Sequence, residues 1–400
     1  TNGRQTFALA DPPLGVAFGA DGRALVVTTT QFLLFEPSTG TMLVLDTIAG
    51  IAAKTLPQPP ASLPTEIVAA SVAASGNKMK IAGVTDSILF HYGVATRSAT
   101  SYNYVASPEL GPRTISVSQT GETWLAGWAI FDKAGALAQF GDPSGDLNVG
   151  SHAIDTARNI IYAQVTQTPK EGSTTAAVTV PELKVVDADN LRTRERLRLK
   201  ENLSGKGVLN SDGSVMYALS ESGLTILPVG ALASQPRVKS GQEDVVFRAS
   251  GCTNSVVTQS LEIADPGGNS TPFKLKPSIS GVRLSQTSGT TPATVQVSVD
   301  PSVFENTSGT TVAEIAITST TAVNMIDPVR VLINLKDPDQ RGTFVNVPGK
   351  LVDLLADTQR KRFYVLRQDT NELLVFDGTS YEKVATLRTG NTPTSMAFTF

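Results

Sequence analysis

The chain has a single cysteine, Cys252, and only two histidines, His91 and His152. One cysteine cannot form a disulfide within the chain. It fits a reducing compartment, and it fits equally well a secreted bacterial protein that avoids cysteine. Metal and haem centres built from imidazoles need several histidine ligands, so two histidines far apart in the sequence argue against that class of protein.

Charge and long apolar runs are also scarce. Charged residues make up 17% of the chain and the net charge is −3, so no basic excess exists to neutralise phosphates and we expect no nucleic-acid partner. No apolar run approaches the roughly 18 residues of a membrane helix, so we expect no transmembrane segment. The N-terminus, TNGRQTFALADPP, lacks the basic-then-apolar pattern of a secretory signal. We expect that such a signal was removed or precedes residue 1.

What the chain has is a repeated pattern of short strands. Gly207–Gly230 reads as three apolar strands separated by a Ser-Asp-Gly turn and a short polar turn. Asp-Gly between apolar runs is a strong hairpin signal, because both positions adopt positive φ readily. Related units, most with four strands, occupy Leu14–Ile48, Val68–Val105, Arg113–Gly141, Ser151–Leu199 and Lys350–Gly390.

Four-stranded units at intervals of roughly 40–50 residues are the sequence signature of a β-propeller. One such sheet cannot bury both its faces alone, so the units are expected to stack around an axis. Thr392–Phe400 reads as the first strand of another copy. We therefore expect an all-β fold with six visible repeats and seven blades in the complete ring, built from residues 1–240 and 339–400.

Residues 241–338 interrupt the repeats with a different pattern. They contain seven candidate strands with regularly spaced turns, which predicts an immunoglobulin-like β-sandwich inserted into the propeller. Alternation in Thr294–Val299 (TVQVSV) and Ala313–Thr318 (AEIAIT) turns one face of each strand inward. The segment has Cys252 alone and no tryptophan, so it is not an antibody-type domain.

Two resemblances follow from these residues. The run Leu284–Ala293 (LSQTSGTTPA), followed by the strand Thr294–Val299 and Asp300-Pro301, resembles a BACON-type module of bacterial surface and secreted proteins. The repeats, most clearly Gly15–Gly40 and Lys350–Gly390, resemble the YVTN/NHL/quinoprotein-like propeller superfamily. The second resemblance implies a fold rather than a function. Together they imply an extracytoplasmic bacterial protein: secreted, periplasmic or at the cell surface.

Five residues are candidates for binding. Trp124 and Trp128 flank a glycine in TWLAGWAI; rings near a propeller channel can stack on sugars, although packing between blades is the commoner role. Arg194, Arg196 and Arg198 alternate along one strand and so share a face. Such a basic stripe contacts an acidic partner or, more commonly, forms a solvated edge that discourages strand addition.

Oxygen-rich loops make calcium a candidate cofactor. Asp142–Asn148 and Asp187–Asn190 gather the ligands that hard cations prefer, without the spacing of a calcium-binding helix–loop–helix motif. Residues of this kind also shape ordinary turns. A lactonase-type channel metal would need carboxylates and amides from separate blades to converge, and the conceivable ligands are Glu66, Asn148, Asn210 and Asp353.

The sequence favours a non-catalytic extracytoplasmic binding or scaffold protein that uses propeller loops and the inserted sandwich to contact a protein or other ligand. No catalytic residue is assigned. A carbohydrate-binding surface protein is one alternative, although Val245–Leu335 contains no Trp or Tyr to form a sugar platform. A metal-dependent propeller hydrolase or lactonase is the other.

Overall fold

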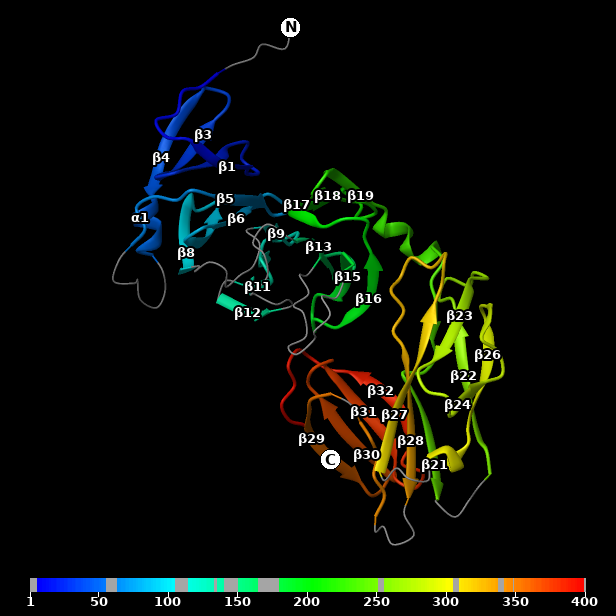
Figure 1. The fold of residues 1–400 in the computed structure, drawn as a ribbon. Helices are drawn as coiled ribbons and strands as arrows, with labels where there is room; N and C mark the ends of the chain where they lie inside the picture. The colour runs from blue at the N-terminus through cyan, green and yellow to red at the C-terminus, as the bar shows by residue number, and fades with distance from the viewer. Residues whose placement is uncertain are drawn as a thin grey trace. The chain divides into compact units, whose positions relative to one another are not determined.

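A computed structural model of the chain describes residues 6–54, 63–104, 114–132, 135–139, 150–164, 180–250, 255–304, 309–336, 342–347 and 349–398 (Figure 1). The chain divides into two compact units. Unit 1 comprises residues 1–194 and 199–229, and unit 2 comprises residues 195–198 and 230–400.

Unit 1 is built on five successive antiparallel sheets in which each strand pairs with the next along the chain. The first is β1 (Pro13–Phe18), β2 (Ala24–Thr28), β3 (Gln31–Glu36) and β4 (Thr41–Thr47), followed by the short helix α1 (Ile48–Ala52). The second is β5 (Ala70–Ala74), β6 (Lys80–Thr85), β7 (Ile88–Gly93) and β8 (Ser98–Tyr104). The third is β9 (Ile115–Val117), β10 (Thr123–Ala126), β11 (Ala129–Asp132) and β12 (Gly135–Gln139). The fourth is β13 (Ser151–Asp155), β14 (Ile160–Gln164), β15 (Glu182–Asp187) and β16 (Thr193–Arg198), although residues 195–198 of β16 count with unit 2. The fifth is β17 (Leu203–Leu209), β18 (Met216–Ser220) and β19 (Gly223–Leu227).

The five sheets of unit 1 stack in sequence order. The first strands β1, β5, β9, β13 and β17 lie next to one another in succession (Figure 1). Apolar clusters fill the spaces between neighbouring sheets; Phe32 of the first sheet, for example, meets Phe90 of the second with ring centroids 4.7 Å apart. The facing sides of neighbouring sheets thus bury apolar residues that a single meander could not bury alone.

The predicted hairpin turns are present and depend on left-handed residues. Gly22 and Gly213, in the two Asp-Gly turns, have φ values of 81° and 70°. In the turn that contains Ser75-Gly76, the positive φ of 56° falls on Lys78 instead. Glycine favours this conformation because it has no Cβ, whereas lysine adopts it only where the surrounding turn imposes it.

Unit 2 contains a two-sheet sandwich. One sheet has the order β20 (Lys239–Ser240), β22 (Val257–Ala264), β26 (Ala293–Val299) and β24 (Val282–Leu284). The other has the order β21 (Asp244–Ser250), β28 (Val329–Lys336), β27 (Gly309–Thr318), β23 (Pro272–Pro277) and β25 (Ser288–Thr290). Both sheets face one apolar core that includes Phe247, Leu261, Val297 and Ile315. The predicted strands of this segment are all present, and β20 and β25 are additional.

A further four-stranded meander belongs to unit 2. It comprises β29 (Leu351–Asp357), β30 (Arg362–Arg367), β31 (Glu372–Asp377) and β32 (Lys383–Arg388). Val345 and Val347, which precede it, pack with Val365, Leu374 and Phe376 on one of its faces. We call it sheet six.

The end of the chain departs from the sequence-based prediction. Thr392–Phe400 was predicted as a strand, but residues 391–398 form none. The main-chain N–H of Met396 instead donates to the Asp353 carboxylate at 2.7 Å. A side chain, rather than a neighbouring strand, thus satisfies that part of the backbone.

Helices contribute little. Among the described residues, the helical segments apart from α1 are the 3-10 turns η1 (Val229–Ser234) and η2 (Pro301–Phe304). Within the described ranges, no helix has both the length and the apolar character needed to cross a membrane. The repeated antiparallel sheets confirm the predicted all-β class, and closure of a propeller ring stays a prediction.

Candidate functional site

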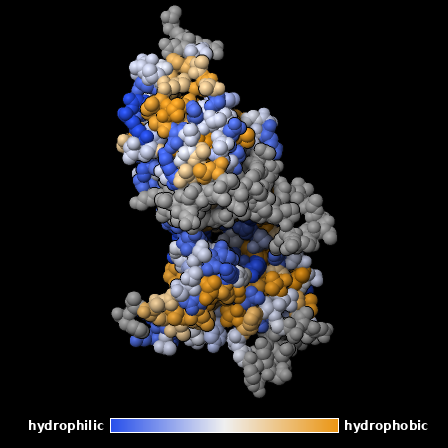
Figure 2. Space-filling model, turned by 90° about the vertical axis from the view of Figure 1, so that its left-hand side faces the viewer, coloured by the Kyte–Doolittle hydropathy of each residue, from blue (hydrophilic) through white to orange (hydrophobic). Residues whose placement is uncertain are grey.

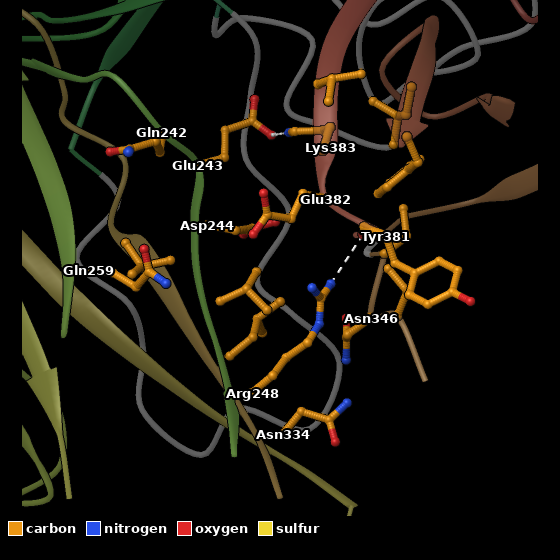
Figure 3. A pocket seen from close by; sticks show the side chains of 18 of the residues that line it. Gln242, Glu243, Asp244, Arg248, Gln259, Asn334, Asn346, Tyr381, Glu382 and Lys383 are labelled. Atoms are coloured by element: carbon orange, nitrogen blue, oxygen red, sulfur yellow. Dashed lines mark hydrogen bonds and ion pairs between the residues drawn. The ribbon is translucent and has the colours of Figure 1, made fainter. Parts of the chain in front are cut away.

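A pocket of about 490 Å³ in unit 2 is the strongest candidate for a functional site (Figure 3). Its volume lies within the roughly 300–1,000 Å³ of small-ligand sites. Three segments supply most of the lining: residues 241–248 around β21, residues 344–347, and residues 381–386 around β32. The pocket thus lies between the edge of the sandwich and the edge of sheet six.

The pocket reaches around the edge of β21. Side chains of a strand alternate between its two faces, so a cavity on one face meets every second residue. Here each residue from Gly241 to Val246 contributes to the lining. Of these, Val245 packs into the sandwich core while Val246 is exposed. Because residues that point into the core and residues that point to solvent both line the cavity, the main chain of β21 itself faces it.

Charged groups in the pocket largely satisfy one another. Lys383 lies 3.7 Å from the Glu243 carboxylate, and Arg330 holds Asp244 at 2.6 Å. Arg248 donates to the main-chain carbonyls of Ser380 at 2.9 Å and Tyr381 at 3.1 Å. In the view of Figure 3 the acidic groups and Lys383 gather at one end of the pocket, and Arg248 lies with two asparagines at the other. The site therefore carries no strong field of one sign.

The turn that receives Arg248 is held firmly by Asp377. The main-chain N–H groups of Thr379 and Ser380 donate to its carboxylate at 2.8 and 2.9 Å, and Arg362 forms an ion pair with it. The N–H groups of Ser380 and Thr379 are the main cause that lowers the pKa of Asp377 to about 2. Asp377 is consequently ionised at any physiological pH and keeps the carbonyls of the turn directed at Arg248.

Exposed rings and amides complete the lining. Phe344 is 55% exposed and Tyr381 is 39% exposed, and Gln259 and Asn346 add amide groups. The Asn334 side-chain amide donates to the Phe344 carbonyl at 2.9 Å and so fixes the segment that carries this ring. The surface offers apolar ring faces beside hydrogen-bonding groups, a combination typical of sites for polar ligands with some apolar surface.

The neighbouring strand edge is satisfied by the chain itself. Gln242 donates its side-chain amide to the Ser260 carbonyl at 3.1 Å and accepts from the Glu262 N–H at 3.3 Å. One glutamine side chain thereby imitates a paired strand along β22. Along β21, in contrast, no residue of the described ranges bonds to the outward main-chain groups of Asp244, Val246 or Arg248.

The structure places both predicted tryptophans in the core of unit 1. Trp124 and Trp128 are each 1% exposed. The Trp124 ring stacks on His91 at 5.2 Å between the second and third sheets, and Trp128 packs edge-on to His152 at 6.3 Å between the third and fourth. Neither indole has a face open to a ligand, because these flat rings fill the spaces between sheets.

The predicted basic stripe is engaged in ion pairs. Arg194 pairs with Asp187, and Arg196 pairs with Asp327. Between them, Glu195 accepts from Arg237 at 2.5 Å and lies 3.0 Å from Lys239. Arg198 is exposed. An acidic partner would have to compete with these internal carboxylates, so contact of the stripe with a partner stays a prediction.

The candidate metal ligands form turns where they are described. Asp187 pairs with Arg194, and Asn210 accepts from the Val215 N–H at 2.9 Å. Asp142–Asn148 lies outside the described residues, and so does Cys252. In the part of the chain that the structure describes, no group of three or more His, Cys, Asp or Glu side chains is placed to hold a metal ion.

The pocket was missed by reasoning from the sequence. The strand at Asp244–Ala249 was predicted, but its position at the edge of a sheet depends on parallel pairing with β28, more than 80 residues later in the chain. The only signal in the sequence is that charged and apolar residues are mixed in two strands that line the pocket, EDVVFR (residues 243–248) and YEKVAT (residues 381–386). Nothing local in either run indicates that the two lie across one cavity.

Comparisons with known proteins show only distant likeness. No protein-family model and no curated protein matches the chain. Among solved structures, the hydrazine synthase of Kuenenia stuttgartiensis is similar over 99% of this chain and 92% of its own, with 10% identity and a TM-score of 0.35. An extracellular domain from B. thetaiotaomicron, described as part of a one-component system, is similar over 82% of this chain, with 9% identity and a TM-score of 0.33.

A xyloglucanase of Bacteroides ovatus, solved with a heptasaccharide, matches 25% of this chain with 17% identity and a TM-score of 0.20. The chain spans 19% of the length of that enzyme and 43% of the length of the extracellular domain. Likeness at this level carries no argument about the ligand, so the function has to be argued from the pocket.

Proposed function

We propose that the chain is a non-catalytic binding protein and that the unit 2 pocket holds its ligand. The proposal rests on the pocket itself, which has a volume of about 490 Å³ and is lined by exposed rings, amides and charged groups of which most are paired. Because most of these charges already have partners, a charged ligand would gain little from them. The site suits a neutral ligand with hydrogen-bonding groups and some apolar surface.

The carbohydrate alternative gains support from two rings at this site. The sandwich alone lacks Tyr and Trp, which weighs against a sugar platform there. Phe344 and Tyr381 come from outside that segment and lie exposed in the same pocket as the amides of Gln259 and Asn346. A glycan is therefore the second candidate ligand.

The test compares two variants of one strand. Val384 and Leu387 of β32 are both 49% exposed, but only Val384 lines the pocket. The protein and its V384R and L387R variants would be applied to arrays of glycans and of short peptides. We expect V384R to abolish the binding of at least one array class and L387R to retain it. Binding that both variants retain, or that neither array shows, would contradict the proposal.

The finer architecture belongs to the same proposal. We infer that the five sheets of unit 1 are blades of a β-propeller and that sheet six is a blade of the same kind. Support comes from the antiparallel meander that all six sheets share, with four strands in every sheet but the fifth, and from the succession of first strands in unit 1. The inserted sandwich would then be the BACON-like module that Leu284–Ala293 indicates.

We also propose an extracytoplasmic location in a bacterium. The support is the resemblance of Leu284–Ala293 to modules of surface and secreted proteins. In the native host, protease added to intact cells should degrade the protein if it is at the surface. Osmotic shock should release it if it is periplasmic. Recovery only with the cytoplasmic fraction would contradict this location.

A further inference from the structure

The unit 2 pocket contains an open strand edge. β21 is the edge strand of its five-stranded sheet, and β32 is the edge strand of sheet six. Edge strands present rows of N–H and C=O groups that can pair with another chain, and proteins usually cover or disrupt such rows. This inference rests on the proposed binding function, in which the open edge of β21 pairs with the ligand.

The pairing of β21 shows which groups face outward. β21 and β28 are parallel, with Asp244 opposite Arg330, and the Arg330 N–H donates to the Glu243 carbonyl at 3.0 Å. In a parallel ladder a residue bonds to the two residues that flank its partner. Arg330 therefore bonds to Glu243 and Val245, and the N–H and C=O of Asp244 are directed away from β28.

The same alternation continues along the strand. The registers of Val246 with Leu332 and Arg248 with Asn334 place these two residues in the same position as Asp244. All three line the pocket. Their outward groups are spaced by two residues, which is the spacing that an added β-strand requires.

The surroundings favour an extended peptide over other occupants. The side chains of Val246 and Arg248 are exposed beside the open edge. On the opposite side lie Val384 and the Tyr381 ring, which can receive alternate side chains. Peptide main chain is neutral and carries donors and acceptors in alternation, so it suits a pocket whose charges are mostly paired and it matches the outward groups of β21.

We infer that the pocket captures an extended polypeptide segment, which adds to β21 as a further strand. Main-chain hydrogen bonds to Asp244, Val246 and Arg248 would supply affinity without sequence dependence. Val384 and the exposed rings would select the side chains at alternate positions. A strand of about five residues, near 17 Å long, would cover the three outward residues.

A substitution at Val246 separates main-chain pairing from side-chain contact. V246P removes the outward N–H, and proline is tolerated on the solvent side of an edge strand. V246T keeps that N–H and the branched shape of the side chain. Peptides would be selected from a displayed library of short random sequences against the unmodified protein, and their affinities measured for the protein and both variants.

We expect the selected peptides to bind V246T like the unmodified protein and V246P about tenfold more weakly, since one main-chain hydrogen bond is lost. Methylating alternate amide nitrogens of a selected peptide should abolish its binding. Circular dichroism of V246P would confirm that the fold is retained.

Three results would overturn the inference: no peptide is enriched, selected peptides bind V246P as well as V246T, or the methylated peptide still binds. A glycan that binds the protein and is lost in V384R but not in V246P would also overturn it. That last result would leave the proposed binding function of the pocket standing, so the two failures are distinguishable.

Discussion

His152 is the residue whose charge state matters most for unit 1. Its ring is fully buried, and its Nδ1 lies 2.8 Å from the Ser116 hydroxyl. Burial lowers the pKa of His152 from 6.5 to about 3, and burial likewise lowers that of His91 to about 4. Both rings are therefore neutral in the folded protein near pH 7 and near pH 5.

These pKa values predict that unit 1 loses stability in mild acid. The unfolded chain takes up a proton on His152 below pH 6.5, whereas the folded chain does so only near pH 3. The free energy of unfolding should therefore fall as the pH is lowered from about 6.5 and level off near pH 3. For His152 alone the loss at pH 5 is about 2 kcal/mol, and His91 adds to it in the same direction.

Urea unfolding followed by tryptophan fluorescence measures this, because both tryptophans lie in unit 1. H152Q removes the titrating group, so its free energy of unfolding should change less between pH 7 and pH 5, whatever its absolute value. Equal stability of the unmodified protein at the two pH values would contradict the burial of neutral histidines.

At the scale of single elements, the turns that begin at Asp155 and Asp357 share one arrangement. Its sequence pattern was not among the turn signals used for prediction. Asp155 accepts from the Arg158 N–H at 3.1 Å and pairs with its guanidinium at 2.6 Å. Asp357 holds Arg360 in the same way, at 3.0 and 2.7 Å. Both begin with Asp-Thr-x-Arg, and in both the next residue is left-handed. The motif stands where the first and fifth sheets have an Asp-Gly turn.

Removing the first of these carboxylates should weaken its hairpin. D155A leaves the Arg158 N–H without its acceptor and removes the ion pair of the guanidinium, which keeps its bond to the Asp212 carbonyl at 3.2 Å. It should lower the free energy of unfolding of unit 1 by about 1–3 kcal/mol. D155N keeps an oxygen acceptor without the charge, and should cost less than D155A. The tryptophan-detected urea transition measures both. A D155A transition that coincides with that of the unmodified protein would show that the turn does not depend on the carboxylate.

Strands were the elements that sequence reasoning predicted best. Alternation and turn residues placed most strands of the repeats and of the sandwich, because both signals are local. Which strand would stand at an edge was not predictable, since β21 pairs with β28 through a long-range parallel contact. The burial of Trp124 and Trp128 likewise depends on neighbouring sheets rather than on the strand that carries them.

At the scale of the whole molecule, apolar faces of the outermost sheets of unit 1 require explanation. The face of the fifth sheet that carries Tyr217, Leu219 and Ile226 is exposed, while Met216 and Ala218 on its other face are buried. On the first sheet Val16 and Phe18 are exposed. Figure 2 shows apolar side chains open to solvent in both units. In a closed propeller, further blades would cover such faces.

If the propeller ring is closed, a lysine introduced on one of these apolar faces should destabilise unit 1. Ile226 is 59% exposed in the structure, and Val68, also in unit 1, is 79% exposed. If another blade covers the fifth sheet, I226K should lower the free energy of unfolding of unit 1 by about 2 kcal/mol or more, because a charge would be buried. V68K should change it by less than about 0.5 kcal/mol. Equal, small effects of the two variants would argue against a closed ring.

The most direct test of the central claim is hydrogen exchange resolved at single amides of β21. The amides of Val245 and Phe247 bond to β28, while those of Val246 and Arg248 face the pocket. We predict slow exchange at the first pair and fast exchange at the second, with protection of the second pair only when a selected peptide is bound. Slow exchange at all four amides in the free protein would mean that the edge is already occupied, and the account of the pocket as a strand-binding site would be wrong.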